Sequence, residues 1–558
     1  FHAPQAYPGH DRCRKGGMIL IKLTLRQGEQ TMVVAAAPAE NILAAVRRAG
    51  IVRESPCNGN GTCGKCLVKL EKPNGEKTEV LACQTPVLQG AIVEISERQD
   101  GHNLQIKQDG IAADVEIDST ITKEYLPGRR VTVVYRNGAL SACETGDTTQ
   151  CIYGVAVDIG TTTLVVALVD LQTGRELAAA GALNPQSRLA QDVLSRIRYA
   201  SHEQGLAEMH RLVTEEINRL IIQVSREAAV APEQIYELVV SGNTCMLHLA
   251  AGIDPSGLGK YPYTPLIRGG EVFAARDIGL AAAEGATVYF PPVMSGYVGA
   301  DITAGVLAAR LAERAGITLF IDIGTNGEMI LAGEGVLTAT STAAGPAFEG
   351  MNISCGMRAA PGAIETFQLL SNGDKVVKTI GGGRETGICG SGLLDIVSEL
   401  VRHGLVGKNG KFAKIAPDGP GGLLARRDNK TVFPLTEDVF LSQQDVRQVQ
   451  LAKGAIRAGI EAMLKHRCLS PGQVDRVLIA GSFGYHLNPD SMLGIGLLPG
   501  AFRGKIEFLG NTAKTGSQMF LLNQATRRQI GGIIAGVAVL ELAKMDNFDR
   551  LFVKCLEF

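Results

Sequence analysis

The chain has 558 residues, which is too many for a single hydrophobic core, so two to four domains are expected. A net charge of −1 and a balance of 45% hydrophobic and 20% charged residues give no reason to expect nucleic acid or a membrane surface as a partner. Because no stretch approaches about eighteen uninterrupted apolar residues, no transmembrane helix is predicted.

Residues 1–17 lack the apolar core of a secretory signal, and patterned sequence begins at Met18. We therefore expect residues 1–17 to lie upstream of the natural start, and we exclude them from the fold. The twelve cysteines do not suggest a disulfide framework. Without an export signal they are expected to be mostly reduced thiols or metal ligands, in a cytoplasmic protein.

Residues 18–97 have the pattern of a small α+β domain. Two alternating runs in residues 18–37 predict a β-hairpin, and a short helix is predicted at 40–49, closed by Gly50. A Pro-Asn-Gly turn then separates two more strand-like runs in residues 68–83. This order of elements predicts a β-grasp, ferredoxin-like domain.

Four cysteines in this domain, Cys57, Cys63, Cys66 and Cys83, have the spacing C-x5-C-x2-C-x16-C. The spacing is close to that of plant-type [2Fe–2S] ferredoxins, with one extra residue in the first gap. The glycine-rich loop between them tolerates unusual backbone angles and lets N–H groups point at sulfur. A structural zinc site is the alternative, but zinc sites more often pair two C-x2-C turns, and this loop has one. A [2Fe–2S] cluster is predicted.

Residues 98–150 separate this domain from the rest of the chain. Residues 97–130 are polar and unpatterned, which predicts a linker, either a flexible tether or a packed segment. Residues 131–150 are expected to form a small hairpin or a reduced middle domain.

From residue 151 onward, the sequence alternates between strand and helix patterns, and one motif occurs twice. A β-branched strand followed by Asp-Ile-Gly-Thr and a second strand appears at 155–170 and again at 319–334, which predicts two similar halves. A tight glycine turn offers N–H groups and hydroxyls to a polyphosphate, and a carboxylate at the strand end can orient hydrated Mg²⁺. A plain β-hairpin is the alternative for either copy alone.

The residues predicted to serve these two turns fall into two groups. Predicted to position Mg²⁺ and phosphate are the carboxylates Asp158, Asp322 and Glu328. Predicted to contact the phosphates of ATP are Gly160, Thr161, Thr162, Thr163, Gly324, Thr325 and Asn326.

These two turns resemble the phosphate motifs of the ASKHA superfamily, which groups acetate and sugar kinases, heat-shock chaperones and actin. The resemblance implies a two-lobed α/β ATPase domain over residues 151–558. It also implies an adenosine motif at 478–484, with Gly481, Ser482 and Gly484 against the nucleotide. Two connecting helices are implied at 299–311 and 531–543, with small residues that let them cross closely. The chain has no Walker A loop and no G-x-G-x-x-G after a strand.

An ASKHA domain behind a [2Fe–2S] domain is similar to the reductive activators of corrinoid-dependent enzymes. Further matching pieces lie at 242–252, 342–365, 385–395 and 495–500. The resemblance implies that ATP drives one-electron reduction of an inactivated Co(II) corrinoid to Co(I). The implied partners are a corrinoid protein or corrinoid-dependent methyltransferase and an upstream low-potential electron donor, and a homodimer is one implied assembly.

Three alternatives stay open at this point. The first is a small-molecule kinase with a regulatory Fe–S domain, for which Asp301 and Asp395 are candidate bases. The second is the ATP-driven reductase of 2-hydroxyacyl-CoA dehydratases, although those proteins hold a [4Fe–4S] cluster between subunits. The third is an electron carrier whose ASKHA part only senses nucleotide.

Overall fold

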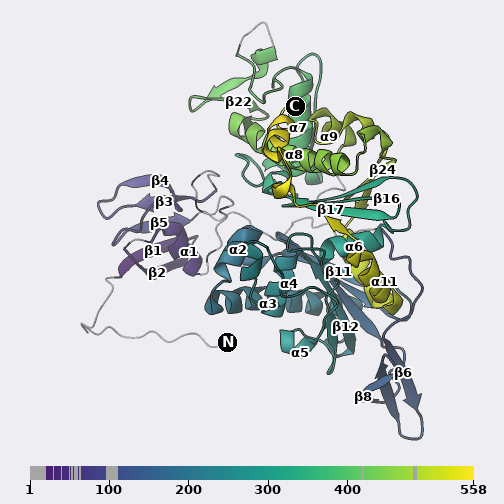
Figure 1. The fold of residues 1–558 in the computed structure, drawn as a ribbon. Helices are drawn as coiled ribbons and strands as arrows, with labels where there is room; N and C mark the ends of the chain where they lie inside the picture. The colour runs from purple at the N-terminus through teal and green to yellow at the C-terminus, as the bar shows by residue number, and fades with distance from the viewer. Residues whose placement is uncertain are drawn as a thin grey trace, which may run out of the picture. The chain divides into compact units, whose positions relative to one another are not determined.

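The structure is a computed structural model of the chain (Figure 1). It describes residues 20–28, 30–38, 40–49, 51, 55, 59, 61, 65–95, 111–415, 420–481 and 487–558. Two compact units divide the chain, one within residues 1–100 and one within residues 101–558, and each is described by itself. Within the described ranges, no helix combines the length and the apolar character needed to cross a membrane.

The first unit is a five-stranded sheet, in the order β2-β1-β5-β3-β4, with one helix. Its elements are β1 (Ile21–Gln27), β2 (Gln30–Ala36), α1 (Ile42–Arg48), β3 (Leu67–Glu71), β4 (Lys77–Leu81) and β5 (Ile92–Ile95). β1 runs antiparallel to β2 and parallel to β5, and buried side chains such as Leu23, Ile42 and Val93 form the core. The predicted β-grasp fold is confirmed, while Gly50 lies outside the described residues.

A three-stranded antiparallel sheet follows, built from β6 (Ile121–Leu126), β7 (Val131–Arg136) and β8 (Ala139–Thr145). The prediction that residues 97–130 form a linker is therefore wrong for the second half of that range. Residues 111–118 are also fixed, because Thr515 donates to the Ile111 carbonyl at 3.0 Å and the Asp118 N–H donates to the Leu522 carbonyl at 2.8 Å. Polar composition misled the prediction, since hydrogen bonds hold this segment together with a few apolar side chains, Ile111, Ala113 and Val115, that pack against the core of the first lobe.

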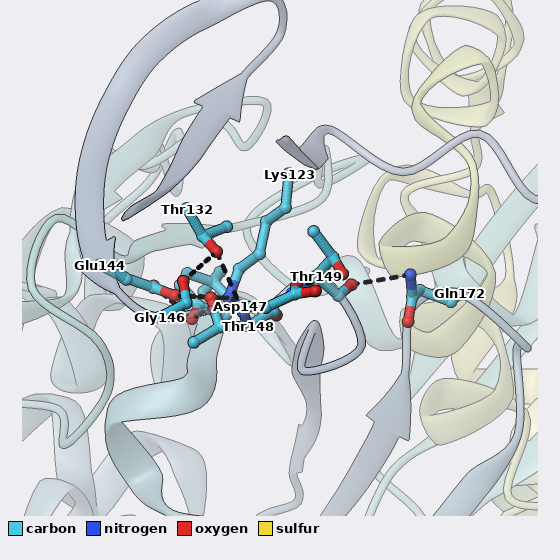
Figure 2. A network of polar contacts seen from close by, with 9 residues as sticks. Lys123, Thr132, Glu144, Gly146, Asp147, Thr148, Thr149 and Gln172 are labelled. Carbon is cyan, nitrogen blue, oxygen red and sulfur yellow. Dashed lines mark hydrogen bonds and ion pairs between the residues drawn. The ribbon is translucent and has the colours of Figure 1, made fainter. Parts of the chain in front are cut away.

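Figure 2 shows the polar network that fixes this small sheet. The fully buried Lys123 ammonium donates to Glu144 at 2.7 Å and to the Thr148 carbonyl at 3.2 Å. It also donates to the Tyr236 hydroxyl at 2.6 Å, and Tyr236 lies in a strand of the next sheet. Because a buried charge is costly unless it is paired and hydrogen-bonded, this network ties the small sheet to the lobe behind it.

Two six-stranded sheets form the two lobes of the second unit. The first has the order β11-β10-β9-β12-β14-β13, with β9 (Tyr153–Ile159), β10 (Thr163–Asp170), β11 (Glu176–Leu183), β12 (Ile235–Gly242), β13 (Val272–Ala274) and β14 (Thr287–Tyr289). The second has the order β25-β24-β15-β16-β17-β26, with β15 (Thr318–Ile323), β16 (Gly327–Gly333), β17 (Val336–Thr342), β24 (Arg476–Ala480), β25 (Ile506–Gly510) and β26 (Ala538–Val539).

The two sheets share one topology. In each, three consecutive strands form an antiparallel meander, and two later strands add in parallel beside the first strand of the meander. The predicted internal repeat is therefore a repeat of whole lobes. β13 and β26 are additions at the sheet edges.

Helices cover both sheets (Figure 1). In the first lobe these are α2 (Val193–Tyr199), α3 (Glu203–Ala228), α4 (Thr244–Ala251), α5 (Ala275–Ile278) and α6 (Ala300–Ala308). In the second they are α7 (Gly390–Arg402), α8 (Gln443–His466), α9 (Pro489–Gly494) and α12 (Phe548–Cys555). Two helices, α10 (Thr512–Leu522) and α11 (Gln524–Ala535), follow the second sheet in the chain, but α10 packs against α6 and against β9 and β12 of the first sheet. Smaller sheets complete the second lobe: β18 (Ala363–Leu369), β19 (Lys375–Thr379) and β20 (Gly387–Ile388), then β21 (Ala425–Arg427), β22 (Lys430–Pro434) and β23 (Phe440–Ser442).

The helix crossing between the lobes is made by α6 and α10. A Cβ on Gly516 would lie 2.2 Å from the Ala304 carbonyl oxygen, and a Cβ on Gly305 would lie 3.2 Å from Thr512 Oγ1. The backbones therefore approach as closely as small residues permit. The first predicted connecting helix, 299–311, is confirmed. The second prediction, 531–543, is wrong, because that segment holds the end of α11 and the short strand β26.

Candidate phosphate and iron–sulfur sites

The two predicted phosphate turns are the hairpin turns between β9 and β10 and between β15 and β16. A Cβ on Gly160 would lie 2.8 Å from the Thr163 carbonyl oxygen, so the first turn closes only around glycine. In the second turn the Gly324 N–H donates to the Asn326 carbonyl at 2.9 Å. Both turns point into the gap between the lobes, and Thr162 Oγ1 lies 3.3 Å from Thr325 Oγ1.

Four carboxylates gather beside these turns. Asp158 and Asp322 are the last but one residues of β9 and β15, Glu328 is the second residue of β16, and Asp301 lies in the first turn of α6. Burial, with repulsion from Asp301 and then Asp158, raises the pKa of Asp322 to about 8. Burial and Asp158 raise the pKa of Asp301 to about 7, and burial with the neighbouring carboxylates raises the pKa of Glu328 well above its usual range.

The ionised carboxylates of such a cluster repel one another, and a bound cation would offset that repulsion. In the described ranges, no group of three or more His, Cys, Asp or Glu side chains is arranged to hold a metal ion by itself. Mg²⁺ usually keeps several waters and binds through one or two carboxylates together with phosphate oxygens. The cluster therefore fits a hydrated Mg²⁺ that arrives with a polyphosphate.

The first turn is braced from several sides. Asn184 donates to the Gly160 carbonyl at 2.9 Å, and its own N–H donates to the Thr162 carbonyl at 2.8 Å. The fully buried Arg196 guanidinium donates to the Thr161 carbonyl at 2.5 Å. Burial lowers the pKa of Arg196 to about 10, so the side chain still carries its positive charge at neutral pH. This charge lies directly behind the turn predicted to bind phosphate.

The second turn is held by the segment that follows β17. The Gly345 N–H donates to the Thr325 carbonyl at 2.9 Å, as the Asn184 N–H does to Thr162 in the other lobe. Thr325 donates its hydroxyl to Glu349 Oε1 at 2.7 Å, and the other oxygen of Glu349 is buried without a hydrogen-bond partner among the described residues. The repeat thus extends to the loop after the third strand of each lobe.

The predicted adenosine motif is described only in part. Gly481 follows β24 and has a φ of 98°, and a Cβ there would lie 2.8 Å from Asp322 Oδ1. This glycine therefore lies against the second phosphate turn. Ser482 and Gly484 lie outside the described residues. Asp395, a candidate kinase base, instead accepts hydrogen bonds from Ser491 at 2.6 Å and from the Phe367 N–H at 3.3 Å, which indicates a structural role.

Two of the four predicted cluster ligands, Cys66 and Cys83, are described, and both are buried. They lie beside each other, because the Ala82 N–H donates to the Cys66 carbonyl at 2.9 Å. Cys83 lies in the turn after β4 rather than on a strand. Cys57 and Cys63 lie outside the described residues.

Two glycines of the predicted cluster loop, Gly59 and Gly61, are described, and both have the unusual backbone angles that the sequence predicted. Gly59 and Gly61 have φ values of 88° and 73°, and a Cβ on Gly59 would lie 3.8 Å from the Cys83 Cβ. Gln84 bridges the loop and the fourth ligand, because its amide donates to the Gly59 carbonyl and lies 3.8 Å from Cys83 Sγ. Two buried thiols under a tight glycine loop fit an iron–sulfur cluster.

Sequence reasoning missed several residues that surround the phosphate turns. Asp301 was predicted only as a candidate base of a kinase, and it is one of the four clustered carboxylates. Asn511 donates to Asp158 Oδ2 at 2.8 Å, and Asn243 donates to Thr161 Oγ1 at 3.1 Å. Their shared local sequence, Gly-Asn-Thr at 242–244 and 510–512, is a signal that could have found them.

The fold and the two sites define the class: an iron–sulfur protein joined to a two-lobed ATP-binding domain. Three family models match the chain. A "2Fe-2S iron-sulfur cluster binding domain" matches residues 25–88, the "RACo middle region" matches 153–314, and the "C-terminal domain of RACo the ASKHA domain" matches 316–558. The named middle region thus corresponds to the first lobe, and it begins after residues 98–150.

The chain belongs to the RACo family, the reductive activators of corrinoid proteins. It is 31% identical to the corrinoid activation enzyme RamQ of Eubacterium limosum, over 89% of this chain and 92% of that protein. It is 25% identical to the [Co(II) methylated amine-specific corrinoid protein] reductase of Methanosarcina barkeri, over 73% and 75%. A solved reductive activator for a corrinoid, iron-sulfur protein matches with a TM-score of 0.74 and 31% identity, over 96% of this chain and 98% of that one.

Proposed function

We propose that this protein uses ATP to drive one-electron reduction of a Co(II) corrinoid, carried by a partner protein, to Co(I). The observation that carries the proposal is the pair of phosphate turns that meet at Thr162 and Thr325, in a chain that also has a [2Fe–2S] domain. Its relatives act on corrinoid proteins, and the family match covers both the cluster domain and the ATP-binding domain.

In this proposal, the two turns hold the ATP phosphates from opposite lobes. The hydroxyls of Thr161 and Thr162 and the amide of Asn326 would donate to phosphate oxygens, together with backbone N–H groups of the glycine turns. Thr325 would join them by turning its hydroxyl away from Glu349. Arg196 adds a buried positive charge behind the first turn. Gly481, with Ser482 and Gly484, would lie against adenosine, since a turn of small residues after β24 lets the ring come close to the backbone.

Asp158, Asp322 and Glu328 would position Mg²⁺, with Asp301 beside them. Mg²⁺ supplies neutralisation of the charge that develops on the transferred phosphoryl group. Because all of these carboxylates are buried and repel one another, the site is better stabilised with its cation and nucleotide than without them. ATP binding is therefore expected to draw the two lobes together.

The electron transfer would use Cys57, Cys63, Cys66 and Cys83 as cluster ligands. Held by these four thiolates, a [2Fe–2S] cluster would supply the single electron that reduction of Co(II) to Co(I) requires. An upstream low-potential donor must then restore it. If the corrinoid has the lower potential, each 59 mV of deficit lowers the equilibrium yield of Co(I) tenfold, so ATP-driven lobe closure must change the partner to make the step productive.

The test is to follow Co(I) formation by visible absorption in a corrinoid partner protein, with reduced activator, with and without Mg-ATP. We expect Co(I) to accumulate only with Mg-ATP, and Cys66→Ala to abolish its formation while Mg-ATP hydrolysis persists. Asp322→Ala should abolish both. Equal Co(I) yields with and without ATP would contradict the proposal. Size-exclusion chromatography with light scattering tests the proposed homodimer separately.

A further inference from the structure

The tripeptide Gly-Asn-Thr occurs twice in the sequence, and both copies end a parallel strand and begin a helix. In the first lobe, β12 ends at Gly242, Asn243 caps the helix, and α4 begins at Thr244. In the second lobe, β25 ends at Gly510, and Asn511 caps α10. Asparagine is among the preferred residues at this position, so capping alone would explain its presence.

Capping uses only one end of each side chain. The Oδ1 atom of Asn243 accepts from the Met246 N–H at 3.1 Å, and the Oδ1 atom of Asn511 accepts from the Lys514 N–H at 2.8 Å. The amide nitrogen is left free by the cap, and in both copies it reaches the same phosphate turn. Asn243 Nδ2 donates to Thr161 Oγ1 at 3.1 Å. Asn511 Nδ2 donates to Asp158 Oδ2 at 2.8 Å.

Both asparagines make these hydrogen bonds in buried, closely packed surroundings. Asn243 and Asn511 are only 8% and 3% exposed. A Cβ on Gly242 would lie 2.7 Å from the Ile159 carbonyl oxygen, so the first copy packs directly on the strand end that carries the turn. The second copy begins α10, whose Gly516 packs against α6 at the crossing between the lobes. The first phosphate turn is thus held by one asparagine from each sheet.

The direction of each hydrogen bond matters for phosphate binding. A hydroxyl group has one proton to donate and two lone pairs to accept with. Because Asn243 is the donor, Thr161 keeps its own proton for a phosphate oxygen. Because Asn511 is the donor, it fixes one carboxylate oxygen of Asp158 and leaves the other for a cation. A carboxylate in place of Asn243 would accept the Thr161 proton instead, and a carboxylate in place of Asn511 would repel Asp158.

We propose that Asn243 and Asn511 are positioning residues of the phosphate site. Each caps a helix with its side-chain oxygen and donates with its amide nitrogen to the first phosphate turn, Asn243 from the end of β12 and Asn511 from the end of β25. The inference rests on the proposed function of that turn in ATP binding. It goes further, because it assigns a role at the ATP site to two residues that act through their hydrogen bonds to Thr161 and Asp158.

The experiment replaces each asparagine by aspartate, Asn243→Asp and Asn511→Asp. Aspartate caps helices as well as asparagine does, so the caps remain while the amide donor is replaced by a charged acceptor. Asn511→Ser, a good cap with too short a reach, removes the second donor without adding charge. The matched control is Asn523→Asp: Asn523 caps α11 and donates to the Glu116 carbonyl at 2.8 Å, about 18 Å along α10 from Asn511.

We expect Asn243→Asp, Asn511→Asp and Asn511→Ser each to lower kcat for Mg-ATP hydrolysis by about 10- to 100-fold, the usual loss for residues that orient ligands. Asn511→Ser, which adds no charge, should change the thermal midpoint of the ligand-free protein least, whereas each aspartate variant is expected to lower it because it buries an additional carboxylate. Stabilisation by Mg-ADP, read as a shift of that midpoint, should be smaller in all three variants and unchanged in the control.

Two results would overturn the inference. Wild-type kcat and a wild-type Mg-ADP shift in both aspartate variants would mean that the asparagines only cap their helices. If the control Asn523→Asp lost as much kcat as Asn243→Asp and Asn511→Asp, the effect would again come from helix capping and not from the phosphate site. Failure of the proposed function has a different signature, because the wild-type protein itself would then neither hydrolyse ATP nor respond to Mg-ADP.

Discussion

The two predicted phosphate turns join equivalent strands of the two sheets but differ in how their aspartates are supported. Asp158 accepts a hydrogen bond from Asn511, and burial, opposed by that bond, raises its pKa to about 6. Asp322 holds the same position in the second hairpin, but no described residue donates to its carboxylate. Burial and the neighbouring carboxylates therefore raise its pKa further, to about 8. Among the described residues, the Asn511 amide is therefore the hydrogen-bond donor that Asp158 has and Asp322 lacks.

This difference suggests a division of work between the lobes. The first turn is fixed by Asn184, Asn243, Asn511 and Arg196 before any ligand arrives. In the second turn, the buried charge of Asp322 is compensated by no donor in the described part of the chain. A cation bound there with ATP would provide that compensation, so the second turn is the one whose energy changes most on binding. Each prediction below tests this asymmetry.

The largest effect is expected from Asp322→Ala. Because Asp322 is the less compensated of the two aspartates, its removal should lower kcat for Mg-ATP hydrolysis by about 100-fold or more, the size of effect seen when a transition-state contact is lost. Steady-state hydrolysis assays measure this. Glu334→Gln, an exposed carboxylate at the other end of the same hairpin, is the control and should leave kcat unchanged. Near-normal turnover in Asp322→Ala would mean that this turn is only a hairpin.

The rate should also depend on pH in the range set by these groups. Asp322, with a pKa of about 8, and Asp158, with a pKa of about 6, must both be ionised to hold a cation. Protonation on the acid side should therefore lower kcat/KM for Mg-ATP by roughly tenfold or more between pH 8 and pH 6. In Asp322→Asn the residual activity should lose the part of this dependence above pH 7. A flat profile in the wild-type protein would contradict the assignment.

The asymmetry also depends on α10, which carries Asn511. Gly516→Ala should destabilise the protein by about 1–3 kcal/mol, because the new Cβ would lie 2.2 Å from the Ala304 carbonyl oxygen. Gly531→Ala, in α11, meets no atom within 4 Å and should stabilise it by about 0.5–1 kcal/mol. Chemical denaturation measures both. Equal effects would mean that α6 and α10 do not cross as described.

The smallest effect is a gain of stability at the expense of function. A carboxylate whose pKa is raised on folding adds stability at low pH, and that stability is lost as the pH rises through the folded-state pKa. Because the folded-state pKa of Asp322 is about 8, ionisation of Asp322 should make the ligand-free protein less stable as the pH rises from 6 to 8. Asp322→Asn should stabilise it at pH 8 by about 0.5–2 kcal/mol, and Asp158→Asn by less, because Asp158 is already hydrogen-bonded. The reverse order would contradict the comparison.

The sequence predicted the parts of this site that are local. A strand, Asp-Ile-Gly-Thr and a second strand are contiguous, so their repetition revealed both hairpins and the two-lobed fold. Asn243, Asn511 and Arg196 reach the first turn through hydrogen bonds that span 35 to 353 positions in sequence. Such contacts are created by tertiary folding, and hydropathy and turn patterns do not register them.

The helix crossing shows the same limit. Small residues at 531–543 suggested a close helix contact, but Gly531 and Gly532 have no neighbouring atom within 4 Å of a Cβ position. The tight contact is made by the single Gly516 of α10, in a helix whose other residues gave no such signal. Small residues permit close approach, and the position of a helix between two sheets decides whether it occurs. The packed segment 111–126 was missed for a related reason, since its partners lie in α10 and β7.

The central claim is that the two predicted phosphate turns bind the phosphates of the same nucleotide. Isothermal titration of Mg-bound, non-hydrolysable ATP analogue into the wild type, Asp158→Ala, Asp322→Ala and the double variant tests it most directly. We predict one site per chain, weakened by either substitution, with a double-variant loss clearly different from the sum of the two because both residues serve the same ligand. Wild-type affinity in either single variant, or losses that add as for independent sites, would contradict the account.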